Sequence, residues 1–115
     1  SFPTRRSSDL LELLFHIPNG GSRNKAEAGR FKAEGVKAGV PDLFLPVARG
    51  KWHGMFIEMK RRAGGRVSPE QKAWIDELRE QGYQARVAFG WEEASEMLLD
   101  YLERTPTENF ARSGR

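Results

Sequence analysis

The sequence predicts an α/β protein, because segments with strand-like and helix-like spacing of apolar residues follow one another along a short chain. The predicted order is strand, helix, strand, strand, helix, strand and helix. These elements span residues 13–17, 24–34, 43–47, 55–60, 68–81, 85–89 and 92–103. A chain of 115 residues suits one domain with one modest core, and the sequence contains no internal repeat.

The four predicted strands are short and mostly apolar. Residues 13–17 form an apolar run that ends at Pro18, and an Asn-Gly-Gly turn follows. In the other three strands, apolar residues occupy every second position, which is typical of a strand with two different faces. The alternating residues are Leu43, Leu45 and Val47, then Met55, Ile57 and Met59, then Ala85, Val87 and Phe89.

The helix at 68–81 is the most clearly marked of the three predicted helices. Ser68 is a good N-cap, a proline occupies the first helical position, Gln71 completes a capping box and Gly82 ends the helix. The segment 24–34 is rich in Ala, Lys and Glu and predicts a surface helix. The last helix is expected to turn four residues inward, namely Ala94, Leu98, Tyr101 and Leu102.

The second and third strands are predicted to pair as an antiparallel hairpin around a turn at residues 49–51. Asp42 and Glu58 each lie eight residues from Gly50, so a turn centred there places them opposite each other. Side chains so opposed have Cβ atoms about 4.5–5.5 Å apart, and like charges at that distance repel. Two carboxylates held together need a proton or a cation between them, and a hard divalent ion fits. Lys60 leaves the strand on the same face as Glu58.

Each of these residues also has an ordinary structural interpretation. Asp42 follows a proline and is typical of a turn or a helix cap. Glu58 and Lys60 are compatible with the solvent-facing side of an exposed strand. Phe56 shares their face, which argues against a simply polar surface.

Four motifs resemble the VRR-NUC domain, a small branch of the PD-(D/E)xK nuclease superfamily found in phages, in bacteria and in a eukaryotic DNA-repair nuclease. They are Phe15-His16-Ile17-Pro18-Asn19-Gly20-Gly21, Gly39-Val40-Pro41-Asp42-Leu43, Ile57-Glu58-Met59-Lys60 and Gly65-Arg66-Val67-Ser68-Pro69-Glu70-Gln71. The PD…ExK pattern followed by SPEQ at a helix start is much more specific than PD…ExK alone. The resemblance implies a restriction-endonuclease-like core, in which a mixed β-sheet with flanking helices carries a catalytic β-hairpin.

The resemblance also implies a Mg²⁺- or Mn²⁺-dependent DNA endonuclease that hydrolyses phosphodiester bonds and leaves a 5′-phosphate. Asp42, Glu58 and the Met59 carbonyl would then bind the metal. Lys60 would position the attacking water or stabilise the phosphate, and Gln71 would lie beside the active site as a further catalytic residue. For Gln71 the capping box is an equally good explanation, and both roles can coexist.

The family further implies DNA as the partner, a junction or flap as the preferred structure, a homodimer, and a role in phage or bacterial replication or repair. Two alternatives stay open. One is a DNA-binding module without catalysis, and the other is a nuclease domain that needs a partner subunit. Metal-dependent nicking of DNA separates the first alternative from an enzyme.

The charge pattern is compatible with DNA binding. A formal net charge of +3 permits a polyanionic partner without requiring one. Basic clusters before the first motif and after the second favour phosphate binding over an ordinary solvated surface. The candidate DNA-binding residues are Asn19, Arg23, Lys37, Arg61, Arg62 and Arg66. Trp52 and His53 are expected to stack on bases or to pack at a subunit contact, and Tyr83 and Arg86 to meet phosphates or to lie on the surface.

Both ends of the chain are predicted to lie outside the nuclease domain. Residues 1–10 resemble the translated sequence of a sequencing adapter, so we expect them to be non-native, with the nuclease domain at 11–103 and a polar, disordered tail at 104–115. VRR-NUC domains usually open with a helix that brings another acidic residue to the active site. We expect that helix to be missing, and Glu12 is not assigned the role of that acidic residue.

The sequence has no cysteine, no bilayer-spanning apolar run and no signal-peptide pattern, which predicts a cytoplasmic protein.

Overall fold

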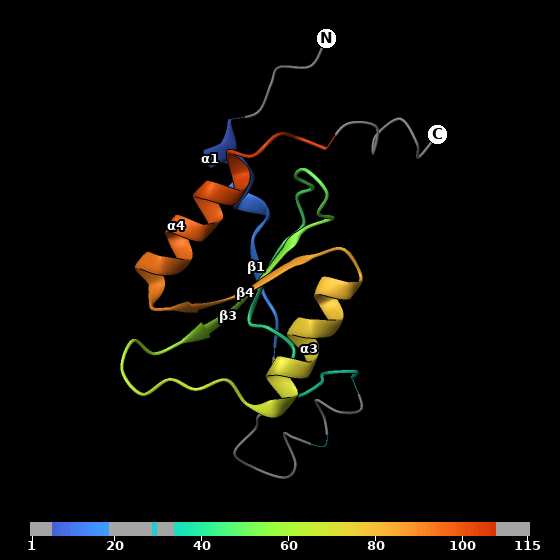
Figure 1. Ribbon diagram of the computed structural model, residues 1–115, viewed down its shortest axis with the longest axis vertical. Coiled ribbons are helices and arrows are strands. Elements are labelled where there is room, and N and C mark those ends of the chain that lie inside the picture. Colours follow the sequence, from blue (N-terminus) through green and yellow to red (C-terminus); the bar gives the residue numbers. More distant parts are fainter. Residues whose placement is uncertain (1–5, 19–28, 30–33, 108–115) are drawn as a thin grey trace.

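The computed structural model describes residues 6–18, 29 and 34–107, and these contain a four-stranded mixed sheet flanked by helices (Figure 1). The strands lie across the sheet in chain order: β1 (Phe15–His16), β2 (Leu43–Leu45), β3 (Met55–Lys60) and β4 (Gln84–Phe89). β1, β2 and β3 are antiparallel neighbours, whereas β4 runs parallel to β3. The predicted α/β fold with a mixed sheet is therefore confirmed.

The helices α3 (Pro69–Glu80) and α4 (Trp91–Leu102) lie on opposite sides of the sheet (Figure 1). α3 links β3 to β4, because a parallel pair of strands needs a crossover connection. A helical turn, α1 (Ser7–Leu10), and a 3₁₀ turn, η1 (Leu11–Leu13), precede β1. α1 contacts α4, so this part of the segment predicted to be non-native has a place in the fold. In the described part of the chain, no helix is long and apolar enough to cross a membrane.

β1 and β2 are shorter than the sequence predicts. β1 has two residues and β2 has three. Pro18 and Pro46 follow these strands at short distance, and proline has no N–H to donate to a neighbouring strand. The predicted helix at 24–34 lies outside the described residues except for Gly29 and Glu34.

The hairpin of β2 and β3 has the predicted register. The opposed pairs are Leu43 with Ile57, Phe44 with Phe56, and Leu45 with Met55. A two-residue turn at Gly50 and Lys51 closes the hairpin arm, and Arg49 and Trp52 exchange backbone hydrogen bonds of 3.1 and 2.9 Å across it. Gly50 has a φ of 53°, a left-handed conformation that two-residue hairpin turns require and that glycine adopts without strain.

The two faces of β3 pack against different parts of the protein. The core beneath α4 includes Leu45, Met55, Ile57, Leu98 and Tyr101. On the other face, the ring of Phe56 stacks on Phe44 with centroids 4.2 Å apart and meets Tyr83 edge-on. Because side chains alternate along a strand, the face that carries Phe56 also carries Glu58.

The hairpin arm is tied to α4 by two buried hydrogen bonds. The hydroxyl of the fully buried Tyr101 donates to the Val47 carbonyl at 2.7 Å. The guanidinium of Arg49 donates through Nε to the Leu102 carbonyl at 3.1 Å. These contacts fix the arm on the helix, so the direction of β3 and the position of its far end depend on them.

The first residues of the predicted tail also lie against the hairpin arm. The Gly50 amide donates to the Thr105 carbonyl at 2.8 Å, and the Thr107 hydroxyl donates to the Gly50 carbonyl at 2.8 Å. Residues 108–115 lie outside the described part of the chain, and their predicted disorder stays a prediction.

We expect Tyr101→Phe to lower the free energy of unfolding by about 1–3 kcal/mol, because it leaves the buried Val47 carbonyl without its donor. Urea denaturation measures this loss. Tyr83→Phe is the matched control, since it removes the same hydroxyl from a half-buried ring on the other face of the sheet. Equal losses for both variants would contradict a specific role for the bond between Tyr101 and Val47.

Candidate active site

Glu58 is the buried carboxyl at the centre of the candidate site. It lies in β3, which has strand neighbours on both sides, and its exposed fraction is 3%. A carboxyl in such a place is costly to ionise unless a hydrogen bond, an opposite charge or a metal ion compensates it. The neighbouring groups therefore determine whether the Glu58 carboxyl is protonated or ionised.

Asp42 is the nearest partner of Glu58. It lies at a bend before β2, where its Oδ2 accepts a hydrogen bond from the Met59 amide at 2.7 Å. The Ile17 amide donates to the Asp42 carbonyl at 2.6 Å, so the segment after β1 also fixes this bend. The side chains of Asp42 and Glu58 share a hydrogen bond. The convergence of the two carboxyls that the hairpin register predicts is thus observed.

The carboxyl of Glu58 has a strongly shifted titration. Its pKa is raised from the usual 4.5 to about 8. Burial is the largest cause, followed by the hydrogen bond to Asp42 and the negative charge of that residue, and Lys60 offsets part of the shift. At neutral pH the metal-free pair therefore holds a proton between its oxygens. A cation placed at the same point would replace that proton.

Lys60 is held in place by the start of α3. Its Nζ donates to Gln71 Oε1 at 2.7 Å and lies 3.9 Å from Glu58 Oε2. The same Gln71 oxygen accepts from the Ser68 amide at 2.8 Å, and Ser68 Oγ accepts from the Gln71 amide at 3.1 Å. The predicted capping box is confirmed. Because one oxygen serves both the cap and the lysine, the helix start positions the ammonium group.

The loop before Asp42 approaches α3 closely. Gly39 has a φ of 92°, and a Cβ at this position would lie 2.9 Å from the Glu70 carbonyl carbon, so glycine is required. A cleft of about 320 Å³ remains between loop, strand and helix. Its lining includes Gly39, Val40, Glu58, Ser68, Glu70 and Gln71. Glu70 was not among the predicted site residues, although its place beside Gln71 in the first turn of the helix was an available signal.

The donors at this site fit a hard divalent ion. Asp42 and Glu58 present carboxyl oxygens to each other, and the Met59 carbonyl is a further oxygen donor next to them in the chain. Among the described residues, no group of three or more His, Cys, Asp or Glu side chains could hold a metal ion. An ion here would therefore rely on two carboxylates and complete its shell with water, as Mg²⁺ commonly does.

The four candidate DNA-binding residues that the structure describes do not gather at the carboxyls in the way that Lys60 and Gln71 do. Three of them are exposed cations: Lys37, Arg61 and Arg66. Arg62 pairs with Glu92 at 3.2 Å, and a pair so exposed contributes little to stability. Asn19 and Arg23 lie outside the described residues.

These features define a class of protein. An α/β domain carries Pro41-Asp42 at one arm of a hairpin and Glu58-Met59-Lys60 on the other, with the carboxyls in contact and the lysine beside them. This is the arrangement that the resemblance to the PD-(D/E)xK nucleases implies.

Comparison with known proteins specifies the family. The sequence matches the VRR-NUC domain over residues 5–92, and the chain belongs to this family, which is known as a nuclease domain. It is similar to a solved structure described as a VRR_NUC domain protein, with a TM-score of 0.72 and 36% sequence identity. That match covers 84% of this chain and 73% of the other. A search of curated proteins gives no match. The expected family and fold are therefore confirmed.

The metal-free protein is expected to lose stability as pH rises from about 5 to 8. The folded state raises the pKa of Glu58 from 4.5 to about 8, so in this window the folded chain keeps a proton that the unfolded chain has released. The contribution of Glu58 is full below pH 4.5 and is lost as the pH rises through the window to about 8. Melting temperatures measured in a chelator across this range test the effect. Glu58→Gln should flatten the slope, and an unchanged slope would contradict the assignment.

Proposed function

We propose that this chain is a Mg²⁺- or Mn²⁺-dependent endonuclease that hydrolyses phosphodiester bonds in DNA. The observation that carries the proposal is the buried carboxyl pair of Asp42 and Glu58 beside Lys60, whose ammonium group Gln71 holds. Membership of a nuclease domain family supports the class of reaction.

Asp42, Glu58 and the Met59 carbonyl would hold the ion. When bound, such an ion lowers the pKa of a water molecule and neutralises charge on the scissile phosphate. Glu58 must release its proton to become a ligand, and its pKa of about 8 means that metal affinity rises with pH over the neutral range. The Met59 amide keeps Asp42 oriented by its 2.7 Å hydrogen bond, so one of the two ligands is already in position.

Lys60 would act on the phosphate or on the attacking water. Its ammonium group has three donors, and Gln71 Oε1 takes one of them. Its side chain is 14% exposed, so the group is largely desolvated but keeps some contact with solvent. A donor fixed in such a place stabilises charge that develops during the reaction without needing to reorganise.

We extend the proposal to branched DNA, a junction or a flap, cut by a homodimer in phage or bacterial replication or repair. A four-way junction presents two equivalent strands, and a two-fold dimer carries two equivalent sites. Cleavage rates on linear duplex, flap and four-way DNA, with the mass of the complex from light scattering, test this extension. Equal rates on all three substrates would contradict the structural preference.

Asp42→Ala and Glu58→Gln are each expected to lower the cleavage rate in Mg²⁺ by more than about 100-fold, because each removes a negatively charged carboxylate that would hold the ion. DNA affinity measured in a chelator should stay close to that of the parent. Asp76→Asn is the control, since it neutralises an exposed carboxylate that pairs with Lys72 on α3. Salt-sensitive DNA binding by the parent without any metal-dependent cleavage would contradict the proposal and indicate a DNA-binding module.

Gln71→Ala and Ser68→Ala separate the structural role of the capping box from the positioning of Lys60. Ser68→Ala removes the Oγ cap but keeps the backbone amide that holds Gln71, so we expect a stability loss of about 1 kcal/mol without a comparable loss of rate. Gln71→Ala also releases Lys60, so the rate per folded molecule should fall on the order of 10- to 100-fold. Thermal melting and single-turnover cleavage give the two quantities. Equal rates for both variants would remove Gln71 from the active site.

A further inference from the structure

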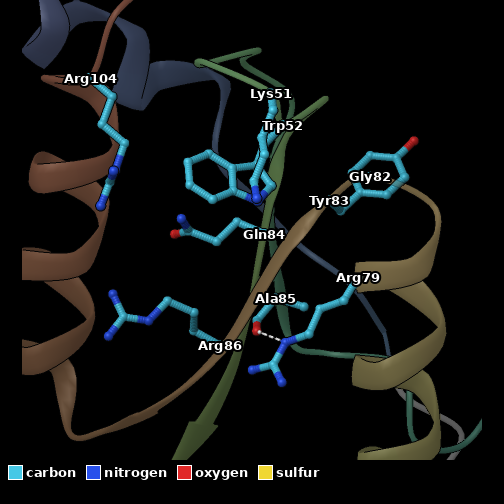
Figure 2. Close-up of a pocket in the computed structure, with 9 residues that line it drawn as sticks. All are labelled: Lys51, Trp52, Arg79, Gly82, Tyr83, Gln84, Ala85, Arg86 and Arg104. Carbon is cyan, nitrogen blue, oxygen red and sulfur yellow. Dashed lines mark hydrogen bonds between the residues drawn. The ribbon is translucent and has the colours of Figure 1, made fainter.

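A second cleft lies beside the first half of β4, away from the carboxyl pair. It measures about 740 Å³ (Figure 2). Four cations from four parts of the chain line it: Lys51 of the hairpin turn, Arg79 of α3, Arg86 of β4 and Arg104 just after α4. No described acidic residue is among the residues that line it. Cations from such distant segments meet here only because the fold brings them together.

Contacts with neighbouring groups hold three of these cations, Arg79, Arg104 and Lys51, at the cleft. Arg79 donates through Nε to the Ala85 carbonyl at 2.9 Å, which leaves the other N–H groups of its planar fork available (Figure 2). The guanidinium of Arg104 lies 5.2 Å from the centre of the Trp52 ring, and Lys51 Nζ lies 5.4 Å from it. An anion that enters the cleft therefore finds donors whose conformational freedom is already reduced.

Acidic residues bound the cleft on its α4 side. Asp100 lies 3.5 Å from Arg104, but both side chains are exposed and such a pair is weak. Arg86 also lines a neighbouring cleft together with Glu93, Glu96 and Asp100. These carboxylates repel a polyanion from the surface of α4, so a phosphate chain is directed along β4 and not across the helix.

We propose that this cleft binds backbone phosphates of the nucleic acid outside the scissile position, an inference that rests on the proposed function. Ala85, which anchors Arg79, lies two residues before Val87, and Val87 is opposite Glu58. Two residues of a strand span about 7 Å along its backbone, and Arg86, which is opposite Ile57, leaves β4 on the face that α4 covers, whereas Glu58 lies on the other face. A DNA strand carries a phosphate about every 3.4 Å along the duplex axis, so a duplex cut at Glu58 has phosphates within a few base pairs of the cleft. Arginine forks and an ammonium group suit such oxygens.

The test compares Arg86→Gln and Lys51→Gln with Lys72→Gln, which removes an exposed cation of α3 outside the cleft. The probe is a fluorescent DNA duplex, and its anisotropy is followed in a chelator over a range of salt concentrations. Each cleft variant is expected to weaken binding at low salt by about fivefold or more. The slope of log affinity against log salt should fall by about 0.9 for each phosphate that the variant no longer neutralises. Lys72→Gln should change neither quantity.

Affinity and salt slope of both cleft variants equal to those of Lys72→Gln would overturn this inference. All three side chains are exposed, and melting curves establish that the variants are folded. Because the assay needs no cleavage, its outcome is independent of the proposed chemistry. If the parent cuts DNA and the cleft variants bind it normally, the proposed phosphate-binding cleft is wrong but the nuclease proposal stands. If the cleft variants bind DNA more weakly but the parent does not cut it, the nuclease proposal is wrong but the phosphate-binding cleft stands.

Discussion

The buried carboxyl of Glu58 is the constraint on which the arrangement of this domain depends. A carboxyl with an exposed fraction of 3% must be protonated, paired or bound to a cation. Three segments meet to satisfy it. The bend at Asp42 shares a hydrogen bond with it, its own strand supplies the Met59 amide that orients Asp42, and the start of α3 supplies the contact that keeps Lys60 beside it. A change in any one segment therefore alters the balance between proton and cation at Glu58.

The capping box links the stability of a helix to the geometry of the site. Gln71 Oε1 accepts two hydrogen bonds, from the Ser68 amide and from Lys60 Nζ. The first satisfies a backbone donor at the helix start, where α-helices have unpaired N–H groups. The second draws an ammonium group into a place that is otherwise poor for a charge. The helix start also packs on Gly39 so closely that a Cβ there would meet Glu70. Helix position, loop position and lysine position are thus fixed by one set of contacts.

The sequence predicts the centre of the site better than its surroundings, for physical reasons. The register of the hairpin follows from local facts: the turn at Gly50, the alternation of apolar residues and the symmetric placement of Asp42 and Glu58 about the turn. The double role of Gln71 was open because its cap is local, whereas its contact with Lys60 depends on how α3 packs on the sheet. The close approach at Gly39 and the cationic cleft depend on packing between distant segments, which periodicity does not encode. The length of β1 was overestimated because an apolar run does not show where strand pairing ends.

The separation of charge along the sheet has a consequence for how metal and DNA bind. Near the cleft of Glu58 the chain concentrates carboxyls, which repel a phosphate until a proton or a cation neutralises them. Beside the start of β4 it concentrates cations, which attract phosphate in either case. Under the proposed function, contacts between DNA phosphates and the cationic cleft would therefore keep the DNA bound while the carboxyl pair is still protonated. Under the proposed function, an ion that replaced the proton at Glu58 would lower the repulsion at the scissile phosphate, so metal and DNA would each favour the binding of the other. Linkage would make this proposed effect reciprocal: DNA bound through the cationic cleft, with a phosphate near the pair, would raise the affinity of Asp42 and Glu58 for the divalent ion.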